Sequence, residues 1–123
     1  MEINDITEAI IGAGIKVHST LGPGLLESAY RACMAHELRK HGLIVQEELV
    51  LPVRYDGVAI DAGYRMDLLV ENAVVVELKA CEHLLPIHEA QLLTYLKLSG
   101  NKIGLLLNFN VKFFRDGIKR MAN

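Results

Sequence analysis

The sequence predicts a mixed α/β (α+β) fold, in which helices flank a mixed β-sheet. Three observations carry this prediction: two helical segments at the front of the chain, two strand-like segments around a short central turn, and a late helical segment between strands. A length of 123 residues suits one domain, so we expect residues 1–123 to form a single domain. Hydrophobic residues make up 51% of the chain, which excludes intrinsic disorder.

Two helices are predicted first. Asp5 and Glu8 have the spacing of a capping box, and apolar residues follow at helical spacing, which predicts a helix over Ile6–Thr20. The turn-forming residues after Leu21 end this helix, and a second helix is predicted over Leu25–His41.

Strand patterns follow the two helices. Leu43–Val53 is rich in β-branched and aliphatic residues, and Asp56-Gly57 is a turn signal. Tyr64–Val70 and Val74–Ala80 each alternate between an apolar face and a face that carries charge, which predicts a β-hairpin.

The remainder of the chain predicts one more helix and two strands. Pro86–Leu98 begins with a proline and is closed by a glycine, as helices often are. Ile103–Phe109 is a continuous apolar strand, and Val111–Arg115 is predicted as a last short strand before a basic tail. The predicted order is two helices, four strands, a helix and two strands.

The charge is unevenly distributed along the chain. The formal net charge is −2, yet residues 97–123 carry six lysines and arginines against one aspartate, so the acidic excess lies in residues 1–96. The basic residues of this segment form either a solvated face or a stripe that contacts phosphates.

Features of membrane and disulfide-bonded proteins are missing from the sequence. The uncharged aliphatic stretch Ala9–Ile15 is too short to span a bilayer, and the acidic residues before it do not suit a signal peptide. Two cysteines, Cys33 and Cys81, are too few for a disulfide framework. We therefore expect a cytoplasmic protein without membrane association.

The predicted hairpin brings two carboxylates together. If its loop is centred on Asn72, Asp67 stands opposite Glu77, with Cβ atoms roughly 5 Å apart. Like charges in this position are destabilising, and a divalent cation such as Mg²⁺ or Mn²⁺ would offset the repulsion. Lys79 points to the same face, and the carbonyl of Leu78 could reach the metal. The alternative is a solvated polar face with a salt bridge.

Several segments together resemble one known family. Asp67 followed by Glu77-Leu78-Lys79 resembles the motif of the PD-(D/E)XK nuclease superfamily. Gly24–Tyr30 resembles the GxxExxY signature of one small family within it. Further resemblance covers Ala90–Leu96, Leu105–Phe109 and Gly117–Arg120, so that it extends from about Asn4 to Arg120.

This resemblance implies a restriction-endonuclease-like core and Mg²⁺- or Mn²⁺-dependent hydrolysis of phosphodiester bonds in DNA or RNA. It implies that Asp67 and Glu77 hold the metal and that Lys79 is the catalytic lysine. Glu27 matches an additional acidic residue beside the metal, and Gln91 matches a glutamine that orients the substrate or the lysine. The proline that usually precedes the first acidic residue is replaced here by Met66.

Other residues are candidates for substrate binding. Tyr95 lies one helical turn after Gln91, either as core packing or as a phosphate or base contact. Four basic residues are candidate phosphate contacts: Lys112, Arg115, Lys119 and Arg120. A homodimer is expected, because many small nucleases of the superfamily act as two-fold dimers. Two alternatives stay open, a non-catalytic metal- or nucleic-acid-binding module and an assembly partner on the same fold.

Overall fold

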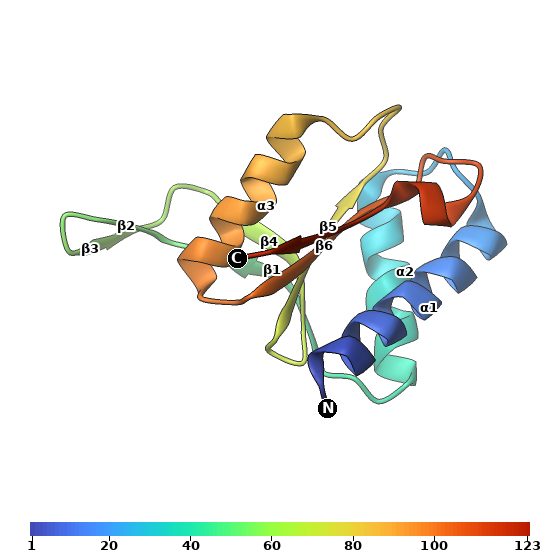
Figure 1. The fold of residues 1–123 in the computed structure, drawn as a ribbon, viewed down its shortest axis with the longest axis horizontal. Helices are drawn as coiled ribbons and strands as arrows, with labels where there is room; N and C mark the ends of the chain where they lie inside the picture. Colours follow the sequence, from blue (N-terminus) through green and yellow to red (C-terminus); the bar gives the residue numbers. More distant parts are fainter.

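A five-stranded mixed sheet organises the chain in the computed structural model, which describes residues 1–123 (Figure 1). The strand order is β1-β4-β5-β6-β7; β5 and β6 are parallel, and the other neighbours are antiparallel. The elements are α1 (Ile3–Leu21), α2 (Glu27–Lys40), β1 (Val45–Val50), β2 (Val53–Tyr55), β3 (Val58–Ile60), β4 (Arg65–Val70), β5 (Val74–Lys79), α3 (Pro86–Ser99), β6 (Ile103–Asn108), the 3-10 helix η1 (Phe114–Gly117) and β7 (Ile118–Ala122).

Helices cover both faces of this sheet. In Figure 1, α1 and α2 lie together on one side and α3 lies on the other. Each face has its own buried cluster: Leu68, Val76 and Leu105 belong to the cluster under α1 and α2, whereas Leu69, Val75 and Leu106 belong to the cluster under α3. This arrangement confirms the predicted mixed sheet flanked by helices, and it is consistent with a restriction-endonuclease-like core.

The central hairpin has the predicted register. Leu68 pairs with Val76 and Val70 pairs with Val74, which centres the connection on Asn72. Asn72 has a φ of 53°, a left-handed conformation that asparagine tolerates better than most residues.

The alternation predicted for β4 is wrong at its first residues. Met66 belongs to the cluster under α3, although Leu68 belongs to the opposite cluster. The ladder between β4 and β5 ends at Leu68, so the regular alternation of faces does not continue beyond it. On the other side of β4, Glu48 has a φ of 48° where β1 passes Asp67, so β1 is irregular at the same level.

Two other segments differ from the prediction. Leu43–Val53 contains β1 and only the first residue of β2, because the chain leaves the ladder at Leu51 and Pro52, so five strands rather than four precede α3. The first helix begins earlier than predicted. Glu2 is its N-cap, and Asp5, the third residue of the helix, completes the capping box.

The predicted strand Val111–Arg115 is also wrong. The segment leads into η1, and the last strand, β7, lies in what was predicted to be a tail. Phe114 packs directly on Gly14 of α1, and a side chain at Gly117 would collide with the carbonyl oxygen of Asn108. These contacts with distant parts of the chain fix the turn, and sequence periodicity does not report them.

The hairpin of β2 and β3 extends away from the body of the molecule (Figure 1). Its strands pair only with each other, and Tyr55, Val58 and Ile60 are exposed on it. Elsewhere, none of the helices is both long and apolar enough to cross a membrane.

Candidate active site

Asp67 and Glu77 are joined where the ladder between β4 and β5 stops. The backbone N–H of Asp67 donates to Glu77 Oε2 at 2.7 Å, and the backbone N–H of Leu78 donates to Asp67 Oδ2 at 2.9 Å. Each carboxylate is thus held by the backbone of the opposite strand. The structure brings together the two acidic side chains that the hairpin register predicts to be close.

Burial makes this pair electrostatically costly. Glu77 is 5% exposed, and burial together with the charge of Asp67 raises the pKa of Glu77 to about 8. Burial also raises the pKa of Asp67 above its usual range. Without a cation, the pair therefore retains a proton at neutral pH.

The donor set of the pair suits a divalent cation. Glu77 Oε1 and Asp67 Oδ1 accept no hydrogen bond from any protein donor, whereas their partner oxygens are oriented by backbone N–H groups. Oriented carboxylate oxygens are the ligands that Mg²⁺ and Mn²⁺ prefer. Asp67 and Glu77 therefore fit a hard metal ion.

Lys79 lies two residues after Glu77, and its charge acts on both carboxylates. It ends β5, and its positive charge lowers the pKa of both Asp67 and Glu77 against the effect of burial. Its side chain makes no ion pair within the protein, while its backbone carbonyl accepts the N–H of Phe109 at 2.9 Å. Leu78 lies between these residues, and its side chain packs in the cluster under α1 and α2.

Glu27 approaches from the first turn of α2. It is exposed, and its negative charge raises the pKa of both Asp67 and Glu77, which places it within electrostatic reach of the pair. No group of three or more His, Cys, Asp or Glu side chains has a geometry that could hold a metal ion. Glu27 therefore does not complete a three-carboxylate cage in this structure.

Arg31 is a charged neighbour that the sequence analysis missed. It lies one helical turn after Glu27, and its charge lowers the pKa of Asp67. Its Nη2 is 3.5 Å from Glu48 Oε1, and its Nε is buried without a hydrogen-bond partner. The spacing of four residues from Glu27 was the available signal, because such residues share a helix face.

Gln91 and Tyr95 form the part of the site that α3 contributes. Gln91 Nε2 donates to the Tyr95 hydroxyl oxygen at 3.1 Å. Tyr95 is 4% exposed, and burial, followed by the charges of Glu77 and Asp67, raises its pKa. Tyr95 thus packs in the cluster under α3 and lies within electrostatic reach of the carboxylates, while a phosphate or base contact by Tyr95 stays a prediction.

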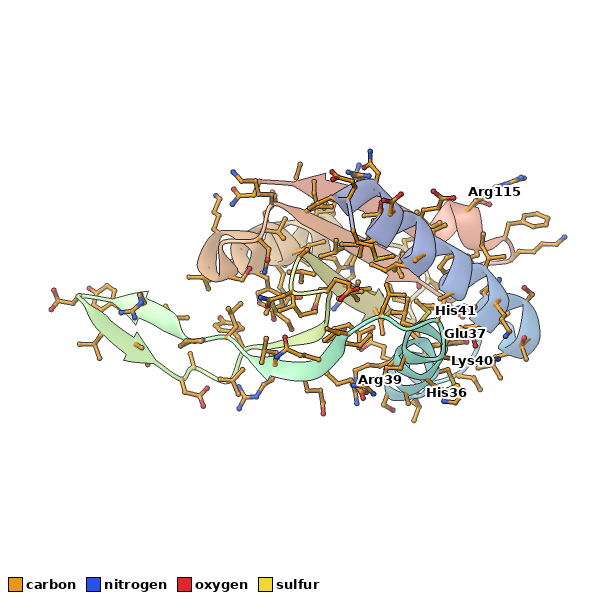
Figure 2. The ribbon with its side chains drawn as sticks, turned by 90° about the horizontal axis from the view of Figure 1, so that it is seen from below. His36, Glu37, Arg39, Lys40, His41 and Arg115 are labelled. Carbon is orange, nitrogen blue, oxygen red and sulfur yellow. The ribbon has the colours of Figure 1, made fainter.

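The four basic candidates do not gather in one place. Lys112 and Arg115 flank the ring of Phe113 in the segment between β6 and β7. Lys119 pairs with Glu89 of α3 at 3.7 Å, and Arg120 donates to Asn4 Oδ1 at 3.1 Å. Figure 2 shows Arg115 directed outward, well apart from the basic side chains of α2. Substrate binding by these four residues stays a prediction.

Family comparison agrees with this geometry. A model of the PD-(D/E)XK nuclease superfamily matches residues 4–121, so the chain belongs to that superfamily. The match includes Asp67 and Glu77-Leu78-Lys79. No curated protein and no solved structure matches the chain.

Proposed function

We propose that this protein is a metal-dependent nuclease of the GxxExxY family, and that residues 1–123 act as one catalytic domain on DNA or RNA. The observation that carries the proposal is the pair of half-buried Asp67 and buried Glu77, with free carboxylate oxygens and Lys79 beside them. A structural ion pair would not need two adjacent acids withdrawn from solvent. A nuclease needs them to hold a cation against a phosphate.

Asp67 and Glu77 would hold Mg²⁺ or Mn²⁺, with Glu27 in contact through water. The carbonyl of Leu78 remains a candidate ligand. A bound divalent cation lowers the pKa of its water and offsets the negative charge that develops on the phosphate.

Lys79 would position the attacking water and stabilise the developing charge on the phosphate oxygens. Its ammonium is suited to this role because no carboxylate in the protein is within ion-pair distance of it. In the hydrolysis, the water oxygen forms a bond to phosphorus and loses a proton, while the bond to the leaving oxygen breaks and that oxygen gains a proton. Gln91, held by Tyr95, would orient the substrate or the lysine.

A cleavage screen tests this function. Single-stranded, duplex and branched DNA and RNA are incubated with the full chain in Mg²⁺ or Mn²⁺, and Glu77→Ala serves as the inactive control. We expect cleavage by the wild-type protein that EDTA and Glu77→Ala both abolish. Cleavage equal to that of the Glu77→Ala control on every substrate would favour a non-catalytic module or an assembly partner on the same fold, and the net charge of −2 suits the assembly partner.

We also propose that the protein works as a homodimer in the cytoplasm, where Cys33 and Cys81 would stay reduced. An isolated two-stranded hairpin is marginally stable in water, and the hairpin of β2 and β3 exposes Tyr55 and Val58. A second copy of the chain would cover these side chains. Sedimentation equilibrium should then give twice the chain mass of 13.7 kDa, and a single-chain mass at micromolar concentration would contradict the dimer.

A further inference from the structure

An exposed aromatic ring lies in the segment that connects β6 to η1. Phe113 is 52% exposed, whereas the next residue, Phe114, is buried against Gly14 of α1. Gly117 at the end of η1 packs on the carbonyl oxygen of Asn108. The ring of Phe113 is therefore presented to solvent by a segment that is anchored on both sides.

Two cations accompany this ring. Lys112 Nζ lies 5.4 Å and the guanidinium carbon of Arg115 lies 5.3 Å from the ring centroid of Phe113. Neither side chain makes an ion pair, although Asp116 is the next residue in the chain. Both cations rest over the ring rather than on a carboxylate, so each can exchange its contact with the ring for one with an external anion while a base takes its place on the ring.

The ring borders a cavity of about 470 Å³ between this segment and the end of α1. His18 and Ser19 of α1 line the cavity, together with Pro23 in the turn that follows. His18 Nε2 donates to the carbonyl oxygen of Val111 at 2.6 Å, which ties the segment to α1. The volume falls within the range of small-molecule sites, roughly 300–1,000 Å³.

A backbone hydrogen bond and a short chain segment connect the cavity to the carboxylate site. Phe109, at the start of the segment, donates its N–H to the carbonyl oxygen of Lys79. Tyr30 stacks on Phe109 at 4.4 Å between ring centroids and donates its hydroxyl to the carbonyl oxygen of Gly22. Pro23 in the cavity wall precedes Glu27 by four residues, a span of at most about 14 Å.

An aromatic ring with unpaired cations is the combination by which proteins hold single-stranded nucleic acid. Bases stack on such rings whatever their sequence, and the cations follow the phosphates. A duplex offers its phosphates but not the faces of its bases, since these are stacked on each other. A ring in this position therefore favours a strand with unpaired bases.

We propose that Phe113 stacks an unpaired nucleobase next to the catalytic site, with Lys112 and Arg115 on the adjoining phosphates. This inference rests on the proposed nuclease function and narrows its substrate to single-stranded or locally unpaired nucleic acid. DNA and RNA share this chemistry, because both present a flat base on a charged backbone.

The test measures fluorescence anisotropy of labelled strands of about 12 nucleotides, as single-stranded DNA, single-stranded RNA and duplex DNA, in EDTA to prevent cleavage. Phe113→Ala should weaken single-strand binding about tenfold, in line with the loss of one stacked base, and change duplex binding less than about twofold. Phe113→Tyr should bind as the wild type does. Ile44→Ala removes an exposed apolar side chain beside the turn at Glu71 and should change nothing.

Three results would overturn the proposal: unchanged single-strand binding by Phe113→Ala, equal weakening of single-strand and duplex binding, or no nucleic-acid binding by the wild type. A parallel cleavage assay in Mn²⁺ distinguishes failure of the stacking proposal from failure of the nuclease proposal. If the wild-type protein cleaves a strand and Phe113→Ala binds single strands as the wild type does, the stacking proposal fails and the nuclease proposal stands. If Phe113→Ala weakens single-strand binding and the wild-type protein cleaves no strand, the nuclease proposal fails and the stacking proposal stands.

Discussion

The two faces of the sheet differ in what they bury. Under α1 and α2 lies a cluster of 19 buried hydrophobic residues, and the buried polar residues on this side, Thr7, His18 and Glu37, belong to the helices and not to the sheet. The cluster under α3 has 8 buried residues, and beside it lie Glu77 and the hydroxyl of Tyr95. The sheet therefore turns apolar side chains towards α1 and α2, whereas towards α3 it also buries a carboxylate. The candidate site thus lies on the side where the hydrophobic cluster is smaller.

The largest stability effect should come from the face with the larger hydrophobic cluster. Leu107 and Leu106 are neighbours on β6, both fully buried, but Leu107 lies under α1 and α2 and Leu106 lies under α3. Leu107→Ala should lower the free energy of unfolding by about 2–5 kcal/mol, because two helices cannot close the cavity it leaves. Leu106→Ala should cost less, since a single helix can move into the space. Urea unfolding of both variants measures the difference, and equal costs would contradict it.

Under the proposed nuclease function, a change on the face that carries Asp67 and Glu77 should alter the cleavage rate more than the free energy of unfolding. Lys79→Ala removes a cation aimed at the developing charge, and loss of one such contact typically reduces the rate by about 10²–10³, or roughly 2.7–4 kcal/mol. Cleavage should fall by this factor on whichever strand the wild type cuts. Cleavage by Lys79→Ala at the wild-type rate would exclude the superfamily mechanism for this chain.

The buried acid should make the metal-free protein less stable as the pH rises. Unfolded Glu77 loses its proton near 4.5 and folded Glu77 near 8, so the folded state holds an extra proton between these values. The free energy of unfolding should therefore fall by a few kcal/mol from pH 4.5 to 8. Glu77→Gln cannot ionise and should lack this fall.

Thermal unfolding in EDTA across this range compares Glu77→Gln with the wild type. The stability advantage of Glu77→Gln should grow with pH and level off above 8. A constant difference between the two proteins would mean that Glu77 ionises normally in the folded state.

The smallest expected effect concerns two glycines of α1. Gly14→Ala would press on the ring of Phe114 and should destabilise the protein by about 1–3 kcal/mol. Gly12 has no neighbour that an added methyl group would meet, so Gly12→Ala should stabilise the helix by up to about 1 kcal/mol. Denaturant unfolding of the pair should give opposite signs, and a loss at Gly12 would show that α1 tolerates neither change.

Much of the site was predictable because it depends on local pattern. The alternation along β4 and β5 predicted a hairpin, and a loop centred on Asn72 predicted the register that places Asp67 close to Glu77. The backbone hydrogen bonds to these carboxylates were not predictable, because they depend on where the ladder ends.

Residues brought in by tertiary contacts were predicted less well. Arg31 lies near Asp67 because α2 packs on the sheet; its spacing from Glu27 indicates a shared helix face but not the contact with β4. Lys119 and Arg120 appeared to be a free basic tail, yet β7 joins the sheet and directs them to Glu89 and Asn4. Charge counted along the chain does not distinguish a free cation from one with a partner inside the protein.

The central claim is that Asp67 and Glu77 hold a divalent cation on the side of the sheet with the smaller hydrophobic cluster. Calorimetric titration of the full chain with Mn²⁺ tests it most directly, alongside Asp67→Asn, Glu77→Gln and Lys79→Ala. We expect one weak site in the wild type, loss of that site in either carboxylate variant, and equal or tighter binding in Lys79→Ala, which makes the site more negative. An unchanged titration in both carboxylate variants would contradict the assignment.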